Sequence, residues 1–134
     1  MEATRHELTV FAVTDVERMT AFYEAAFGWG RRADFPIYVE LADPTGQGVA
    51  FYEREAFSQN TGITPEPAPE GGLTGAELYL RCDDLGASIE RREGAGARLL
   101  RARTLKDWGE EVAYYADPEG NVVALAQRRA DSTE

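Results

Sequence analysis

The amino-acid sequence predicts an α+β fold in which one structural unit occurs twice. The turn signal Asp-Pro-x-Gly, followed by a run suited to a buried strand, occurs at residues 43–54 and again at 117–128. Aligned without a gap, the two windows agree at six of twelve positions. A short strand leading into an acidic helix start also recurs, at Asp15 and Asp84. Repeats of this kind decide architecture, so each half is expected to form a strand, a helix and three further strands.

The first half begins with a strand over residues 7–13. Thr14 and Glu17 have the spacing of a capping box, which predicts that they satisfy the free N–H groups of the following helix. That helix carries an apolar stripe and is expected to end at Gly28, because glycine readily takes the left-handed conformation beyond the last turn. Three short strands are then predicted over residues 29–35, 37–42 and 48–54.

The second half is expected to repeat this order after a linker over residues 55–74 that is rich in proline and glycine. In its first strand, residues 76–82, apolar and polar side chains alternate. Asp83 or Asp84 is expected to cap the next helix. Strands are predicted over residues 97–101, 111–116 and 122–128. The prediction is thus one domain over residues 1–134, with modules at 7–54 and 75–128.

Composition restricts the class of protein. A hydrophobic fraction of 43% is typical of a folded core. The net charge of −10 argues against nucleic acid as a partner, because phosphates require a basic surface. There is no apolar run of about 18 residues and no basic-then-apolar leader, and Cys82 is the only cysteine. We therefore expect a cytoplasmic protein without a membrane span.

Several motifs together resemble those of the vicinal oxygen chelate superfamily. This superfamily contains glyoxalases, extradiol dioxygenases, fosfomycin-modifying enzymes and bleomycin-resistance binding proteins. The segments that carry the resemblance run in the family's order along the chain: Val13-Thr14-Asp15-Val16, Phe22-Tyr23, Phe27-Gly28-Trp29, Trp108-Gly109 and Asp117-Pro118-Glu119-Gly120-Asn121. The resemblance implies two βαβββ modules that form a curled mixed sheet around a cleft, with the helices outside, and often a homodimer.

The resemblance also implies four metal-ligand positions, which fall here on Leu8, Ala50, Glu77 and Ala124. Only Glu77 could bind a metal, and a catalytic metal usually needs three protein ligands. His6, the only histidine, could approach Glu77 if the strands slide, but a lone terminal histidine is more often solvated. We therefore expect neither a metal nor another cofactor.

The alternation of the strands predicts which side chains would line the cleft. Small residues on the closing strands leave volume there, and an apolar cavity with a few polar groups is the usual form of a small-molecule site. Trp108 could overhang the mouth of the cleft or close the edge of the sheet. The predicted ligand-binding residues are Leu8, Val10, Ala50, Tyr52, Glu77, Tyr79, Arg81, Trp108 and Ala124.

The predicted function is metal-free binding of a small molecule, cationic or aromatic, as in the bleomycin-resistance type. The alternative is a lyase, isomerase or dioxygenase of the same superfamily. Its metal ligands would be displaced, or Glu77 would act as a general base whose burial raises its pKa. A purely structural role is the weakest of the three possibilities.

Overall fold

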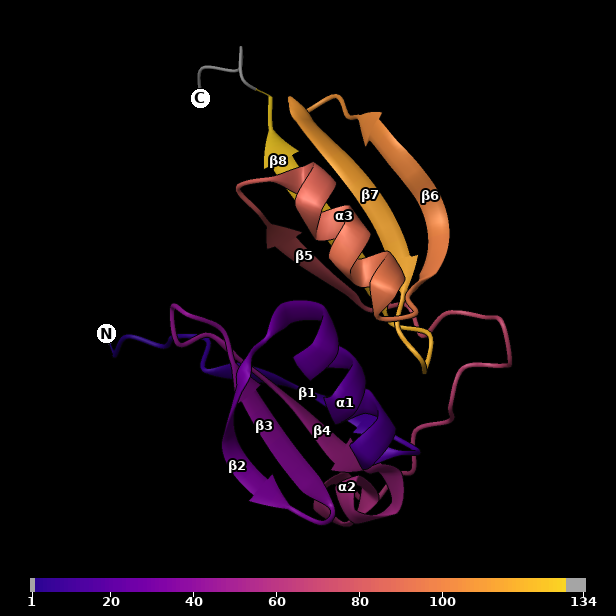
Figure 1. The fold of residues 1–134 in the computed structure, drawn as a ribbon. Coiled ribbons are helices and arrows are strands. Elements are labelled where there is room, and N and C mark those ends of the chain that lie inside the picture. Colours follow the sequence, from indigo (N-terminus) through magenta and orange to yellow (C-terminus); the bar gives the residue numbers. More distant parts are fainter. Residues whose placement is uncertain (1, 130–134) are drawn as a thin grey trace. The chain divides into compact units, whose positions relative to one another are not determined.

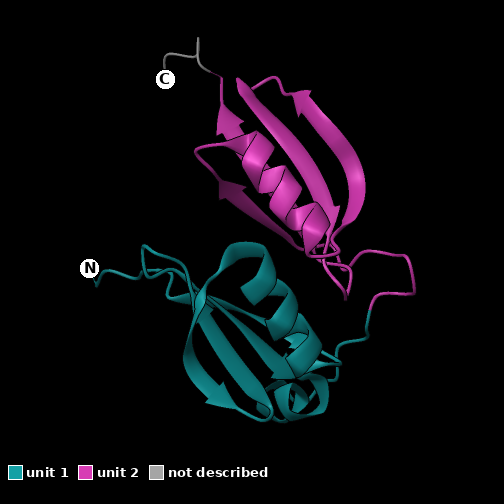
Figure 2. Cartoon of the chain, viewed as in Figure 1, with its two compact units in different colours: residues 1–67 teal, residues 68–134 magenta. Residues whose placement is uncertain are grey.

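The computed structural model describes residues 2–129 and divides into two compact units, residues 1–67 and residues 68–134 (Figure 2). Each unit is built from one four-stranded mixed sheet and at least one helix. The predicted α+β class is therefore confirmed.

Unit 1 contains all the elements predicted for the first half (Figure 1). They are β1 (Leu8–Val13), α1 (Val16–Phe27), β2 (Gly30–Phe35), β3 (Tyr38–Ala42) and β4 (Gly48–Glu53). The strand order is β1-β4-β3-β2, in which β1 runs parallel to β4 and the other pairs are antiparallel. A further helix, α2 (Arg54–Thr61), follows β4 directly.

Unit 2 repeats this topology. Its elements are β5 (Glu77–Arg81), α3 (Leu85–Gly94), β6 (Arg98–Leu105), β7 (Glu110–Ala116) and β8 (Val122–Arg128). The order β5-β8-β7-β6, with β5 parallel to β8, matches unit 1 strand for strand. The βαβββ repeat predicted from the two turn signals is therefore confirmed.

The two turn signals recur because their aspartates perform the same task. Asp43 accepts hydrogen bonds from the backbone N–H groups of Thr45 and Gln47, at 2.8 and 3.0 Å. Asp117 accepts from the backbone N–H groups of Glu119 and Asn121, at 2.9 and 3.0 Å. Each carboxylate thus satisfies the turn's own backbone donors, which stabilises the reversal between two antiparallel strands.

The start of α1 differs from the prediction. Asp15, rather than Thr14, is the N-cap residue, and its carboxylate accepts from the Arg18 N–H at 3.0 Å. Its extended backbone, with φ −129° and ψ 94°, is the usual N-cap conformation. Asp84 caps α3 in the same way, by accepting from the Ala87 N–H at 3.1 Å, which is one of the two predicted alternatives.

The core of unit 1 lies between α1 and its sheet and is strongly aromatic. Tyr23 is fully buried, with its ring centroid 5.1 Å from that of Phe51 and 5.7 Å from that of Phe27. Trp29 is half-buried and stacks on Phe27 at 4.5 Å. Since α1 covers one face of the sheet, the side chains that alternate with this core point to the opposite face.

Two elements depart from the prediction. Residues 54–61 form α2, although most of them fall in the predicted linker. Glu53 caps this helix by accepting from the Ala56 N–H at 3.0 Å, and Gly62 ends it with φ +80°. Strand β6 also continues to Leu105, beyond its predicted end at 101, and its pairing with β7 contains two register shifts. None of the helices in residues 2–129 has the length and apolar character needed to cross a membrane.

Candidate functional site

The sheet face of unit 1 that α1 leaves uncovered carries the predicted residues Val10 and Tyr52. The pairing register places Val10 beside Ala50 on β4, and Tyr38 beside Tyr52. Ala50 is fully buried, so it contributes space rather than contact, whereas Val10 is 37% exposed. Leu8, paired with Gly48, lies further along the same face.

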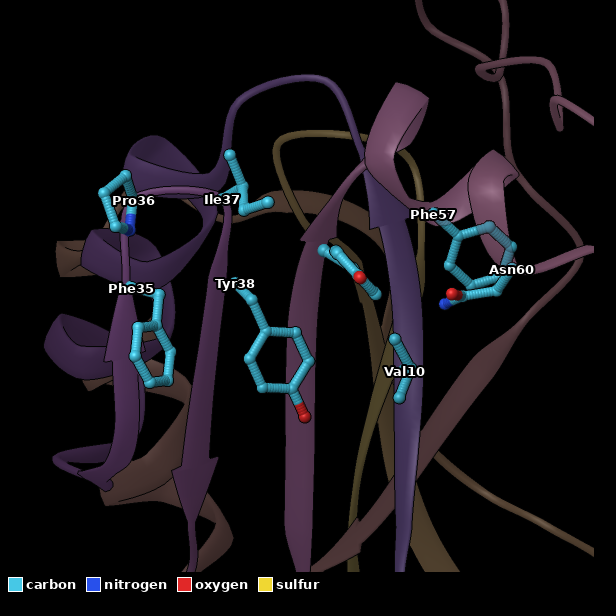
Figure 3. Close-up of a pocket in the computed structure, with 8 residues that line it drawn as sticks. Val10, Phe35, Pro36, Ile37, Tyr38, Phe57 and Asn60 are labelled. Atoms are coloured by element: carbon cyan, nitrogen blue, oxygen red, sulfur yellow. The ribbon is translucent and has the colours of Figure 1, made fainter.

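A hollow of about 740 Å³ opens on this face. Figure 3 shows Tyr38 on β3 and Val10 on β1, with β4 between them, Phe35, Pro36 and Ile37 along one side, and Phe57 and Asn60 from α2 on the other. The Tyr52 ring lies edge-on to Tyr38 at 5.1 Å and to Phe57 at 6.1 Å. This volume and apolar lining are typical of sites for small organic molecules.

The polar atoms next to this hollow are held by one another. The Tyr38 hydroxyl donates to the Glu40 carboxylate at 3.0 Å, and Arg32 Nε donates to the same carboxylate at 2.5 Å. Arg32 also reaches the Gly46 carbonyl at 2.9 Å. Gly48 makes room for this guanidinium, because a Cβ at that position would lie 2.1 Å from Arg32 Nη2. Burial and the Glu40 carboxylate raise the pKa of Tyr38, so its hydroxyl stays protonated at neutral pH.

In unit 2 the predicted alternation of β5 is confirmed. Glu77, Tyr79 and Arg81 are exposed, whereas Leu78 and Leu80 between them are half-buried on the helix side. The general-base hypothesis for Glu77 assumed burial, and the residue is instead exposed. Arg81 pairs with Glu110 at 2.5 Å.

Three of the predicted residues meet around Glu110. The Tyr79 hydroxyl donates to Glu110, the Trp108 indole N–H donates to the Tyr79 hydroxyl at 2.9 Å, and Arg81 pairs with the other Glu110 oxygen. Trp108 is 59% exposed, so it lies over the open side of this group rather than plugging the core. We call Tyr79, Arg81, Trp108 and Glu110 the Glu110 cluster.

Glu110 is 3% exposed, and its charge is stabilised by its neighbours. The hydrogen bond from Tyr79, assisted by Arg81, lowers the pKa of Glu110 below its ordinary value despite the opposing effect of burial. Burial and the hydrogen bond to this carboxylate raise the pKa of Tyr79. Glu110 is therefore a carboxylate and Tyr79 a phenol at neutral pH.

The four positions that correspond to the superfamily's metal ligands do not fit a metal. Leu8, Ala50 and Ala124 have hydrocarbon side chains, which leaves the exposed Glu77 as the one possible ligand. His6, considered above as a substitute, hydrogen-bonds Thr9 at 3.1 Å and Gln47 at 2.8 Å within unit 1. Across residues 2–129 no three His, Cys, Asp or Glu side chains gather closely enough to hold an ion.

Sequence reasoning missed Glu110 and most of the hollow. Tyr38 and Glu110 could have been placed by counting pairs outward from the two Asp-Pro-x-Gly turns, since the hairpin register pairs Tyr38 with Tyr52 and Glu110 with Arg128. Phe57 and Asn60 could not be found in this way, because they belong to a helix that was expected to be linker.

Comparison with known proteins agrees with this architecture. The glyoxalase-like domain family matches residues 8–126. A glyoxylase-like domain-containing protein from Didymella fabae is 28% identical over 121 residues, which cover 86% of this chain and 87% of that protein. CFP32 of Mycobacterium tuberculosis, named as a candidate glyoxylase, is 30% identical over 117 residues. The match covers 85% of this chain but only 42% of that longer protein.

Among solved structures, a glyoxalase-related enzyme from Fulvimarina pelagi is similar, with a TM-score of 0.80 at 20% identity. That match covers 98% of this chain and 96% of the other, and it shows a shared fold. The sequence motifs, the repeated βαβββ topology and the family match agree. The chain belongs to the glyoxalase-like domain family and, with it, to the vicinal oxygen chelate superfamily.

Proposed function

We propose that this glyoxalase-like protein binds a small molecule with a planar aromatic part, in the hollow of unit 1 and without a metal. The observation that carries the proposal is the aromatic lining of that hollow. Tyr38, Tyr52 and Phe57 present rings at right angles to their neighbours, and Phe35 is 60% exposed beside them. Exposed aromatic groups that gather on one surface mark binding sites.

The lining also suggests how a ligand would be held. A flat ring entering between Phe35 and Phe57 would find both aromatic faces and aromatic edges, and such contacts contribute roughly 0.5–1.5 kcal/mol each. Tyrosine rings attract cations, and the protein carries a net charge of −10, so a cationic substituent on the ring would add to the affinity. The amide of Asn60 offers a donor and an acceptor at the rim (Figure 3).

The metal-free part of the proposal rests on the chemistry of the four ligand positions. Hydrocarbon side chains at Leu8, Ala50 and Ala124 cannot bind a divalent ion, and Glu77 alone cannot hold one tightly. Elemental analysis of tag-free protein, followed by titration with manganese, nickel, zinc and ferrous ions, tests this directly. Stoichiometric metal would contradict the proposal, and its loss in Glu77→Gln would identify the ligand.

Calorimetric titration with planar aromatic compounds, each in a neutral and a cationic form, tests the ligand class. We expect Phe35→Ala and Tyr52→Ala each to weaken binding about two- to tenfold, the factor that one aromatic contact provides. Ile63→Ala is the matched control, because Ile63 is an apolar residue of unit 1, 73% exposed, that does not line the hollow. If every compound fails to bind, or if Ile63→Ala weakens binding equally, the proposal is wrong.

A further inference from the structure

A second hollow, of about 330 Å³, lies within unit 2 on the sheet face that carries Glu77. Its apolar lining includes Leu73, Val122 and the ring of Tyr114, and its charged lining consists of Arg101, Lys106 and Glu77. It shares none of its lining residues with the aromatic hollow of unit 1.

Within the described residues the two cations of this hollow are not ion-paired, unlike Arg81 and Arg103 of the same unit. Arg81 pairs with Glu110 and Arg103 pairs with Glu111, each at 2.5 Å. Among the residues that the structure describes, neither Arg101 nor Lys106 has a carboxylate within 4 Å.

Tyr114 brings these cations together. Lys106 Nζ lies 5.5 Å from the centre of the Tyr114 ring and 5.8 Å from that of Trp108, so the aromatic rings hold the ammonium group in place. Arg101 is the cross-strand partner of Tyr114 in the β6–β7 pairing. Arg101 on β6 and Lys106, directly after this strand, therefore both lie next to Tyr114 and line one hollow with Leu73 and Val122.

We propose that this hollow binds a small organic oxyanion, a carboxylate or a phosphate monoester, through Arg101 and Lys106. The apolar part of the ligand lies against Leu73, Tyr114 and Val122. Guanidinium and ammonium groups form charge-assisted hydrogen bonds with both kinds of oxyanion, and arginine can do so with two parallel bonds. This proposal does not rest on the aromatic ligand proposed for unit 1.

Glu77 provides a test in which the expected change is an increase in oxyanion affinity. Its carboxylate lines the same hollow and repels a bound anion, so it opposes the two cations. Glu77→Gln should therefore strengthen oxyanion binding severalfold. If Glu77 had only a structural role, or if it contacted the ligand directly, the same substitution would leave oxyanion binding unchanged or weaken it.

The experiment is an amide NMR titration of the whole chain with benzoate, phenyl phosphate and neutral benzamide. We expect benzoate or phenyl phosphate to shift the amide signals of β5 and β6, whereas benzamide binds at least about tenfold more weakly. Arg101→Gln and Lys106→Gln should each reduce oxyanion affinity about three- to tenfold. Arg98→Gln is the matched control, because it removes an exposed cation from the same strand outside the hollow.

Preference for benzoate or for phenyl phosphate shows which class of oxyanion the hollow favours, and either preference supports the site. The proposal is overturned if neither anion shifts these signals, if benzamide binds equally well, or if Arg98→Gln weakens binding as much as Arg101→Gln. A last control separates the two sites: Phe35→Ala, which alters the unit 1 hollow, should leave benzoate affinity unchanged.

Discussion

Replacing Glu110 by glutamine tests whether its buried carboxylate stabilises unit 2. Glutamine keeps the shape of the side chain and can still accept from Tyr79, but it removes the charge that pairs with Arg81. Hydrogen bonds to a charged group contribute about 1.5–3 kcal/mol. Because the Arg81 side chain is 58% exposed, water screens part of this interaction, and we expect a loss of about 1–2 kcal/mol in the free energy of unfolding.

The neighbouring residue provides the control. Glu111→Gln makes the same chemical change one position along β7 and breaks the pair with Arg103, also at 2.5 Å. Both members of that pair are substantially exposed, with 44% and 32% of their side chains accessible. Exposed pairs contribute less than about 1 kcal/mol, so this variant should lie close to wild type.

Urea unfolding followed by tryptophan fluorescence would measure the difference. In a Trp29→Phe background the remaining tryptophan, Trp108, contacts Tyr79 and reports on unit 2. Because the folded-state pKa of Glu110 is lowered, its stabilisation is present above the unfolded pKa, about 4.3. This contribution is lost as the pH falls through the lower folded pKa, so wild type and Glu110→Gln should converge in acid.

The result that would refute this reasoning is a similar loss of stability in Glu110→Gln and Glu111→Gln at neutral pH. A difference between wild type and Glu110→Gln that persists in acid would also refute it, since the charge would then not be the cause. In either case the charge of Glu110 would not be a special source of stability for unit 2, and the Glu110 cluster would not act as an electrostatic unit.

Two further predictions concern the turns and a buried tyrosine. Gly120→Ala should lower the melting temperature more than Gly46→Ala. Both positions have φ near +90°, so an alanine is strained at either one. A Cβ at Gly120 would also lie 2.7 Å from the Gly72 carbonyl oxygen, whereas the space at Gly46 is open. Equal decreases in the melting temperature would show that the backbone at Gly72 moves to make room for the added methyl group. Burial, with Glu93 nearby, raises the pKa of Tyr115 to about 12, so its phenol should ionise late in an ultraviolet absorbance titration. The contribution of the neutral phenol to the free energy of unfolding is present below the unfolded pKa of about 10 and is lost as the pH rises towards 12. A loss of stability without this late ionisation would contradict the attribution to Tyr115.

The topology could be predicted from sequence because local signals determine it. Asp43 and Asp117 satisfy the backbone donors of their own turns, and Asp15 and Asp84 cap their own helices. Each of these interactions spans four residues or fewer, so a pattern of residue types is enough to indicate it. The alternation of β5 was predicted for the same reason, since side-chain direction in a strand follows sequence spacing.

The site could be predicted only in part because its contacts are long-range. Tyr79 and Glu110 are 31 residues apart in sequence, and Tyr52 meets Phe57 only because residues 54–61 form a helix. That helix has no fully buried residue and its sequence is mostly polar, so its composition did not set it apart from the linker. Leu8, Ala50 and Ala124 remain predicted site residues whose role awaits a ligand.

The two units show why membership of the family does not determine the ligand. Counted from the turn aspartates, Tyr38 corresponds to Val112, since both lie five residues before, and Tyr52 corresponds to Ala126, since both lie nine residues after. In unit 1 the tyrosines line an aromatic hollow, whereas Val112 and Ala126 are fully buried and pack together with Tyr114. The same backbone topology therefore presents an aromatic surface in one unit and a charged hollow in the other. Ligand class is decided by a few side chains on the open sheet faces, and these are the positions where substitutions will be most informative.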